Sequence, residues 1–292
     1  MRLQDALDCF VRQLEADGRS PHTIGQYRRH IALLGSWLAQ EGHGDDVDAL
    51  GHELLARFLV APQVRTARLG GPKRATSMNG LRSSMRAFFS YVHAAGWTTE
   101  NPARLIRRAR CGSPPPRGLS EVDQQRLLTT LASARGRAAE RDYALFATML
   151  GSGVRLSAAL AMRVEDVDLE NAEILARCCK GGRVEKVLLS PAVCNHLRGF
   201  IGGRVSGLLF EGRDQQQLSR RHAARRLAGW ARKAGCQGAV HPHTLRHSFG
   251  QNLYSRCRDP FLVQAALGHR SIVSTLVYVH ADGRSLREYL AG

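Results

Sequence analysis

Residues 241–250, which read HPHTLRHSFG, hold the densest group of side chains that could do chemistry. They place three histidines and an arginine within seven positions: His241, His243, Arg246 and His247. If a helix begins here, His243 and Arg246 lie three residues apart and share a face. Such a pair, beside the free backbone N–H groups of a helix start, favours phosphate binding. The alternatives are a solvated basic helix, or a metal site through His243 and His247 for which no third ligand is evident.

A further histidine follows in the segment DPFLVQAALGHRS. Asp259 is a good N-cap, Pro260 suits the first helical position, and Gly268 favours an end after about two turns. The sequence therefore predicts a short helix that delivers His269 directly after its end.

Tyr278 lies in the next segment, where Ser271 is expected to cap another helix. Ile272, Leu276 and Val279 would form the apolar stripe of that helix. At about 100° per residue, Tyr278 falls about 120° away from the stripe. We therefore expect its side chain to be displayed, as a nucleophile or a partner contact would be. The alternative is a half-buried packing residue.

The charge balance points to a polyanionic partner. The 42 basic residues exceed the 25 acidic ones, which gives a formal net charge of +17. The excess is spread along the chain, with +6 in residues 1–110 and +11 in residues 111–292. This favours nucleic acid, with an anionic membrane surface second. A plain bias towards arginine, which supplies 38 of the 42 basic residues, is the remaining explanation.

The sequence contains no evident membrane-spanning or signal segment, and its cysteines show no pairing pattern. No apolar run approaches the about 18 residues of a membrane span, and Asp5 and Asp8 interrupt the first apolar stretch, so neither a span nor a signal peptide is expected. The seven Cys form no C-x-x-C pair, and Cys178–Cys179 lies in an apolar run. Free or buried thiols in a reducing cytosol are the expectation.

The elements that must position these residues divide into two domains. Helical periodicity over the first hundred residues, with Ser20 and Pro21 opening one helix, predicts a bundle of four or five helices. The segment RRARCGSPPPRGLS cannot continue a helix through its three prolines. We place the domains at 1–108 and 119–292, with a linker over 109–118.

The second domain is mixed. Two β-rich runs flank Gly181–Gly182, which is a hairpin signal, and helical segments surround them. The expected fold is mainly α, with a small antiparallel β-sheet in an α+β second domain.

The motifs of this chain, and their order along it, resemble those of the tyrosine recombinases, the family of phage integrases and Xer-type enzymes. The positions that carry the resemblance are Arg155 (GSGVRLS), Lys180 (CCKGGR), His243 and Arg246 (H-x-x-R), His269 (LGHRS) and Tyr278 (STLVYVH). In the first domain, SPHTIGQYRRHIALLGSWL and LRSSMRAFFSYVHAAGWTTENPA are similar to the family's helical core-binding domain. The resemblance thus covers the whole chain.

The resemblance implies a chemistry for these residues. The Tyr278 hydroxyl would attack a phosphodiester, leaving a 3′-phosphotyrosine and a free 5′-hydroxyl, so no cofactor and no metal is required. Arg155 and Arg246 would clamp the phosphoryl oxygens. His243 would accept or shuttle the Tyr278 proton, and His269 would hydrogen-bond the phosphate.

Two features of the site admit alternatives: the residue that protonates the leaving group, and the acid that supports the first arginine. Lys180, at the hairpin tip, would protonate the 5′-oxygen, with Lys186 on the following strand as the runner-up. The family often has an acidic residue three positions after the first arginine, where this chain has Ala158. Its absence would slow the reaction or be compensated by another acid. For His247 and His280 we expect structural or solvent-facing roles.

The resemblance also implies partners. Both domains would hold double-stranded DNA as a clamp. The protein would be a monomer free in solution and a homo-tetramer in the synaptic complex. Accessory proteins are possible partners, and no membrane is expected. The setting would be the bacterial cytoplasm, at the nucleoid. The reaction would serve integration, excision or resolution of a mobile element, which the 14 residues after Tyr278 weakly favour, or resolution of chromosome dimers. The alternatives are DNA relaxation of the type IB topoisomerase kind and a catalytically impaired DNA-binding relative.

Overall fold

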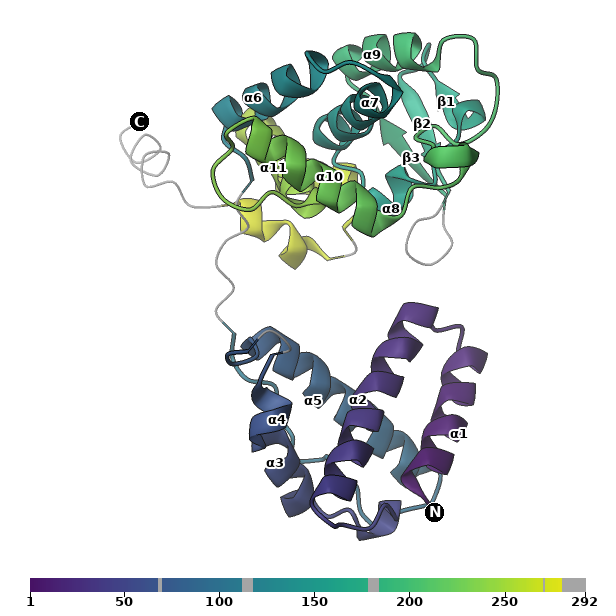
Figure 1. The fold of residues 1–292 in the computed structure, drawn as a ribbon, viewed down its shortest axis with the longest axis vertical. Coiled ribbons are helices and arrows are strands. Elements are labelled where there is room, and N and C mark those ends of the chain that lie inside the picture. Colours follow the sequence, from purple (N-terminus) through teal and green to yellow (C-terminus); the bar gives the residue numbers. More distant parts are fainter. Residues whose placement is uncertain (68–69, 112–117, 178–183, 270, 280–292) are drawn as a thin grey trace. The chain divides into compact units, whose positions relative to one another are not determined.

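The chain divides near Gly112 into two units, Met1–Gly112 and Ser113–Gly292 (Figure 1). The computed structural model describes residues 1–67, 70–111, 118–177, 184–269 and 271–279. None of the helices in these ranges combines the length and apolarity that a membrane span needs. The cysteines within them are all free: Cys9, Cys111, Cys194, Cys236 and Cys257.

The first unit is a helical bundle, as the periodicity predicts. Its described helices are α1 (Leu3–Ala16), α2 (Pro21–Gln40), α3 (His52–Val60), α4 (Pro62–Arg65) and α5 (Ala75–Ala94). Ser20 caps α2 as expected, since its hydroxyl accepts a hydrogen bond of 3.2 Å from the backbone N–H of Thr23. Phe58, Phe88 and Phe89 are fully buried at the centre, so aromatic burial holds the helices together.

The second unit combines helices with a small sheet, as expected for its fold class. Its described helices are α6 (Glu121–Ala132), α7 (Arg137–Ser152), α8 (Leu156–Ala159), α9 (Pro191–Ile201), α10 (Arg220–Lys233), α11 (Pro242–Cys257) and α12 (Pro260–Leu267). Ser120 caps α6, and Asp259 caps α12, as predicted. Figure 1 shows α7 in the middle of this unit, where it packs against α6, α9 and α11.

The sheet contains three antiparallel strands in the order β1 (Val167–Asp168), β2 (Glu173–Ala176) and β3 (Glu185–Leu188). The pairing of β2 with β3 is the predicted hairpin, in the register Ala176↔Glu185. Gly181–Gly182 lie outside the described residues, and β1 was not expected. Ile174 and Ala176 are fully buried, so one face of the sheet lies on the core.

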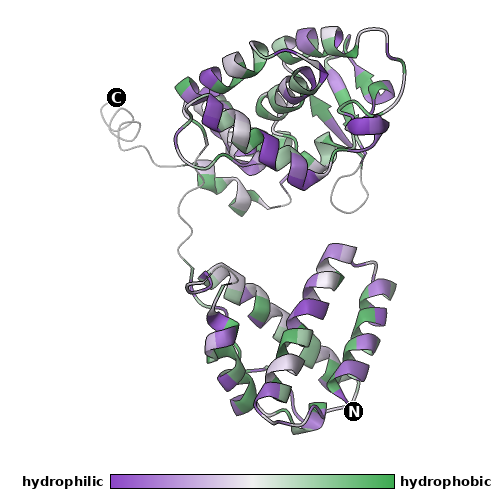
Figure 2. Ribbon diagram, viewed as in Figure 1, coloured by the Kyte–Doolittle hydropathy of each residue, from purple (hydrophilic) through white to green (hydrophobic). Residues whose placement is uncertain are grey.

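Hydropathy along the ribbon matches this packing. Helices of both units carry hydrophobic and hydrophilic residues side by side (Figure 2). This is the pattern of amphipathic helices that bury one stripe against a core.

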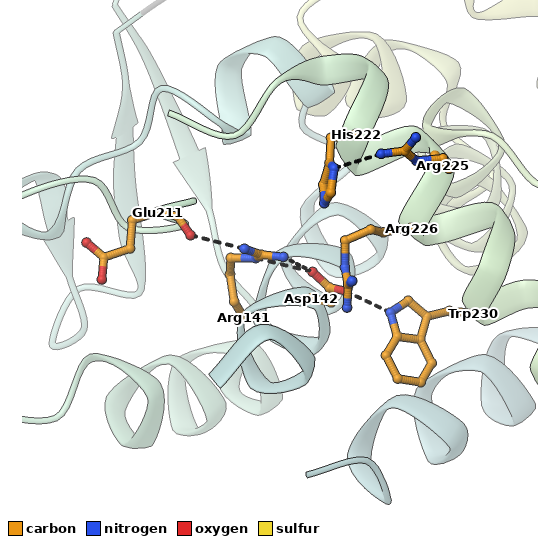
Figure 3. Close-up of polar contacts among 7 residues, drawn as sticks. All are labelled: Arg141, Asp142, Glu211, His222, Arg225, Arg226 and Trp230. Atoms are coloured by element: carbon orange, nitrogen blue, oxygen red, sulfur yellow. Dashed lines mark hydrogen bonds and ion pairs between the residues drawn. The ribbon is translucent and has the colours of Figure 1, made fainter. Parts of the chain in front are cut away.

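A buried carboxylate joins α10 to α7 (Figure 3). Asp142 on α7 is fully buried and accepts hydrogen bonds of 2.7 Å from Arg141 and from the Trp230 indole. It also forms an ion pair with Arg226, which like Trp230 lies on α10. Arg141 further donates to the carbonyl of Glu211, at 3.3 Å. This carboxylate therefore helps to orient α10 on α7, together with the buried apolar residues of α10.

We expect Asp142→Ala to lower the free energy of unfolding of the second unit by about 3–5 kcal/mol, because it leaves Arg141 buried without its counterion. Arg137→Ala is the matched control, since its ion pair with Glu211 involves an arginine side chain that is 82% exposed. The control should lose less than about 1 kcal/mol. Urea denaturation of the full chain measures both, and equal losses would contradict the buried network.

Candidate active site

Helix α11 begins at Pro242, as the sequence predicts, and His241 is its N-cap. The backbone N–H of His241 donates to the Thr244 hydroxyl, at 3.0 Å, which fixes the first turn. His243 lies on that turn and is exposed, whereas Arg246 one turn later is only 6% exposed. Partial burial and then the charges of Arg246 and Arg155 lower the pKa of His243.

Backbone carbonyls hold the Arg246 guanidinium in place. Its Nη1 donates to the carbonyl of Gly153, at 2.7 Å, and its Nη2 donates to that of Leu267, at 2.5 Å. These carbonyls belong to the C-terminal ends of α7 and α12, where helix carbonyls lack intrahelical partners. Carbonyls carry no net charge, so the arginine is fixed without being neutralised by them.

Gly153 makes this arrangement sterically feasible. It ends α7 in the left-handed conformation, with φ of 67°, which favours glycine. A Cβ at this position would lie 2.4 Å from a ring carbon of Phe249. The turn leads directly to Arg155, the N-cap of α8, whose Nη2 donates to the carbonyl of Gly268, at 3.4 Å. Both predicted arginines therefore converge on the turn at the end of α12.

His269 follows that turn, as expected, and is positioned by hydrogen bonds. Its backbone N–H donates to the carbonyl of Gln264, at 3.1 Å. Its Nδ1 lies 2.9 Å from the hydroxyl of Thr275, a fully buried residue. Burial first, and then the charges of Arg246 and Arg155, lower the pKa of His269 to about 4. The imidazole is therefore neutral at physiological pH.

The prediction that Tyr278 is displayed on an α-helix is wrong. Two 3₁₀ turns, Ile272–Ser274 and Leu276–Tyr278, replace the helix, and Ser271 makes no side-chain cap. Tyr278 is 5% exposed and Leu276 is 48% exposed, the reverse of the expectation. A 3₁₀ turn has about three residues per turn, so Tyr278 aligns with the buried Thr275 rather than diverging from it.

The Tyr278 hydroxyl lies against His247, which sequence reasoning had assigned a structural or solvent-facing role. The distance from Oη to His247 Nδ1 is 2.8 Å. The ring rests on Gly250, where a Cβ would lie 2.7 Å from Cζ. Burial raises the pKa of Tyr278, and the charge of Arg246 opposes this rise. A histidine next to the H-x-x-R arginine, and four residues after His243, was the signal available in the sequence.

No metal site accompanies these histidines in the described part of the chain. Within it, no three His, Cys, Asp or Glu side chains gather as metal ligands would. His247, one of the two histidines of the metal interpretation, has its Nδ1 hydrogen-bonded to the Tyr278 hydroxyl.

Comparison with known proteins identifies the family to which this chain belongs. The profile of the Phage integrase family matches residues 118–284, and that of the Phage integrase N-terminal SAM-like domain matches residues 7–96. The chain belongs to the phage integrase family of tyrosine recombinases. It is a DNA-cutting and rejoining enzyme of site-specific recombination, and the topoisomerase alternative is not favoured.

Curated relatives cover almost all of this recombinase. Tyrosine recombinase XerC of Chromobacterium violaceum is 30% identical over 99% of this chain and 94% of the relative. Tyrosine recombinase XerC of Yersinia pestis is 30% identical over 97% and 92%.

Solved structures share the fold. XerH site-specific recombinase bound to its difH substrate before cleavage has a TM-score of 0.73 and 23% identity, covering 96% of this chain and 84% of the other. The Tn1549 transposon integrase in complex with transposon right end DNA has a TM-score of 0.75 and 19% identity, covering all of both chains.

Of the two lysines that are candidates for protonating the leaving group, the structure describes only one. Lys180 lies outside the described residues. Lys186 is on β3, and its Nζ forms an ion pair of 2.6 Å with Glu173 on the neighbouring strand. Lys186 therefore has a structural partner on the sheet surface.

Ala158, three residues after Arg155, where the resemblance led us to expect an acidic residue, lies in apolar surroundings. Ala158 is 3% exposed within the core of the second unit, where an unpaired carboxylate would be costly. A carboxylate near the site comes instead from Glu185 at the start of β3. A Cβ built on Gly268 would lie 3.2 Å from Glu185 Oε2.

We expect His269 to stay neutral down to about pH 4, its lowered pKa, when followed by imidazole NMR. Because the folded pKa lies below the ordinary value of about 6.5, the unfolded chain binds this proton first. The His269 contribution therefore lowers the unfolding free energy as pH falls from about 6.5 towards 4. His269→Asn should lose that part of the pH dependence. An NMR midpoint near the ordinary value would contradict the burial argument.

Proposed function

We propose that this recombinase cleaves one DNA strand at a time, with Tyr278 as the nucleophile and a 3′-phosphotyrosine as the intermediate. The convergence of Arg155, Arg246 and His269 on one turn, with Tyr278 packed beside it, is the observation that carries the proposal. Bond energy is retained in the covalent intermediate, so rejoining requires no nucleotide cofactor.

The two arginines bind the non-bridging phosphoryl oxygens. Arginine is charged at any relevant pH, and its fork of N–H donors matches the geometry of a phosphate. Arg246 and Arg155 already use N–H groups on carbonyls, which orients their planes before DNA arrives. His269 donates a hydrogen bond to the same phosphoryl group. His243, to which the resemblance gave the Tyr278 proton, is exposed on the first turn of α11 and is assigned to the phosphoryl group as well, because the Tyr278 hydroxyl contacts His247.

Lys180 protonates the departing 5′-oxygen. Its proposed place between β2 and β3 follows from the hairpin pairing, which brings the ends of the two strands together at Ala176↔Glu185. Lys186 is the weaker candidate, because its ion pair with Glu173 already engages its ammonium group on the sheet.

Both units contribute to DNA binding. We assign residues 1–108 as the core-binding domain, 109–118 as the linker and 119–292 as the catalytic domain, which together hold double-stranded DNA. In the second unit, α10 exposes Arg220, Arg221 and Arg225. Such a row of cations at the start of a helix suits a phosphate backbone.

The working assembly is a homo-tetramer. Exchange between two duplexes cuts each of their strands once, and each chain has a single Tyr278. The free chain is a monomer that assembles on DNA, and the recombinase acts at the bacterial nucleoid because DNA is its substrate.

The nucleophile is tested with Tyr278→Phe, which should bind DNA normally and form no covalent adduct. Affinity comes from many phosphate contacts, whereas cleavage needs the one hydroxyl. The Phe variant is first used to select bound duplexes from a random-sequence library. The selected duplex, nicked beside the cleavage position, then traps adducts on denaturing gels. An adduct with the Phe variant would exclude Tyr278 as the nucleophile.

The lysines are separated with a 5′-bridging phosphorothiolate, whose thiolate leaves almost without protonation. Lys180→Ala should cleave slowly on normal DNA and be rescued by sulfur. Lys186→Ala should match the wild type on both substrates, and Arg246→Ala should stay slow on both because it acts on non-bridging oxygens. Single-turnover rates measure this. Sulfur rescue of Lys186→Ala alone would reverse the assignment.

A further inference from the structure

The Tyr278 hydroxyl has one described hydrogen-bond partner, and that partner is a base. Its Oη lies 2.8 Å from Nδ1 of His247, with the two rings tilted by 54°. Tyr278 is 5% exposed, so solvent is largely excluded from this contact. A phenol in such a place cannot readily pass its proton to bulk water.

The fold holds the two rings in this relation. His247 and Gly250 lie three residues apart on α11 and therefore share a face. Because Gly250 has no side chain, the Tyr278 ring can lie directly on the helix beside His247. Val263 and Leu267 pack around the same ring. Contacts from two helices thus fix the distance between hydroxyl and imidazole.

We propose that His247 is the general base that takes the Tyr278 proton during strand cleavage. This inference rests on the proposed function, in which Tyr278 is the nucleophile. As the Oη–P bond forms, the phenolic proton moves to His247 Nδ1. The P–O5′ bond breaks, and the 5′-oxygen takes a proton from Lys180. During rejoining, His247 returns its proton to Tyr278.

The charges that face His247 suit this role. Partial burial, then His243 and Arg246, lower the pKa of His247, so the imidazole is neutral before the reaction. His269 is a further neighbour, because His247 contributes to the lowered pKa of His269. A neutral imidazole can accept the proton at physiological pH, and the phosphoryl charge then stabilises the imidazolium. His243, four residues earlier on α11, remains free to contact the phosphate.

The test is His247→Asn, whose side-chain amide can keep a hydrogen bond near the Nδ1 position but cannot take a proton. Single-turnover adduct formation is measured from about pH 6 to 9.5 on the selected, nicked duplex. At pH 7 the variant should be about 10²–10⁴-fold slower than the wild type. Its rate should rise about tenfold per pH unit, because solvent must ionise the phenol. The wild-type rate should level off above the pKa of His247.

His243→Asn is the matched control, with the same substitution one turn earlier on the same helix. It should be slower at all pH values while keeping the shape of the wild-type profile. A wild-type rate and profile in His247→Asn would overturn the proposal. So would a tenfold rise per pH unit in His243→Asn alone, which would make His243 the base.

Failure of the proposed function is distinguishable from failure of this inference. If the wild type forms no Tyr278 adduct, the nucleophile assignment is wrong. If the wild type does form the adduct, and His247→Asn reacts normally, only the assignment of His247 as the base is wrong.

Imidazole ¹⁵N NMR of the wild type provides a measurement that does not depend on the variant's folding. We expect protonation at Nε2, with Nδ1 hydrogen-bonded to Tyr278 and released in Tyr278→Phe. A proton resident on Nδ1 would overturn the proposal.

Discussion

The guanidinium of Arg246 lies between the C-terminal ends of two helices, and the rest of the candidate active site is arranged around it. Its hydrogen bonds to Gly153 and Leu267 tie α11 to the ends of α7 and α12. Carbonyls at helix ends carry partial negative charge, so they attract a cation without cancelling it. Because Arg155 donates to Gly268 in the same turn, both arginines are oriented by one short segment of backbone.

Burial, and then nearby positive charge, also determines the protonation states of the histidines around Arg246. Together with burial, Arg246 lowers the pKa of His243, His247 and His269. The candidate active site therefore combines permanent positive charge on arginine with neutral imidazoles. This division suits a reaction in which charge must be stabilised on phosphoryl oxygens while a proton is accepted elsewhere.

The arginines that support the fold have a carboxylate as their partner. Arg141 and Arg226 both form ion pairs with the buried carboxylate of Asp142, which joins α10 to α7. Ala158, where the resemblance led us to expect an acid, lies within the core of the second unit. The Asp142 carboxylate thus stabilises the scaffold, whereas Arg246 and Arg155 donate to backbone carbonyls at helix ends in the candidate active site.

The sequence by itself determined most of the elements and supplied the candidate residues of the site. Local signals were sufficient for the caps at Ser20, Ser120 and Asp259, for the β2–β3 pairing, and for the order of motifs from Arg155 to Tyr278. Such signals depend on residues a few positions apart, which periodicity and capping chemistry describe well. The short strand β1 left no such pattern.

Only the tertiary structure showed that Tyr278 is buried and that its hydroxyl contacts His247. A helical wheel placed the tyrosine on an open face, but the segment folds as 3₁₀ turns and its ring packs on Gly250 of α11. That contact joins residues 28 positions apart, so no local period could reveal it. Burial of an aromatic ring against a glycine, together with one hydrogen bond to His247, outweighed the weak helical preference of the segment.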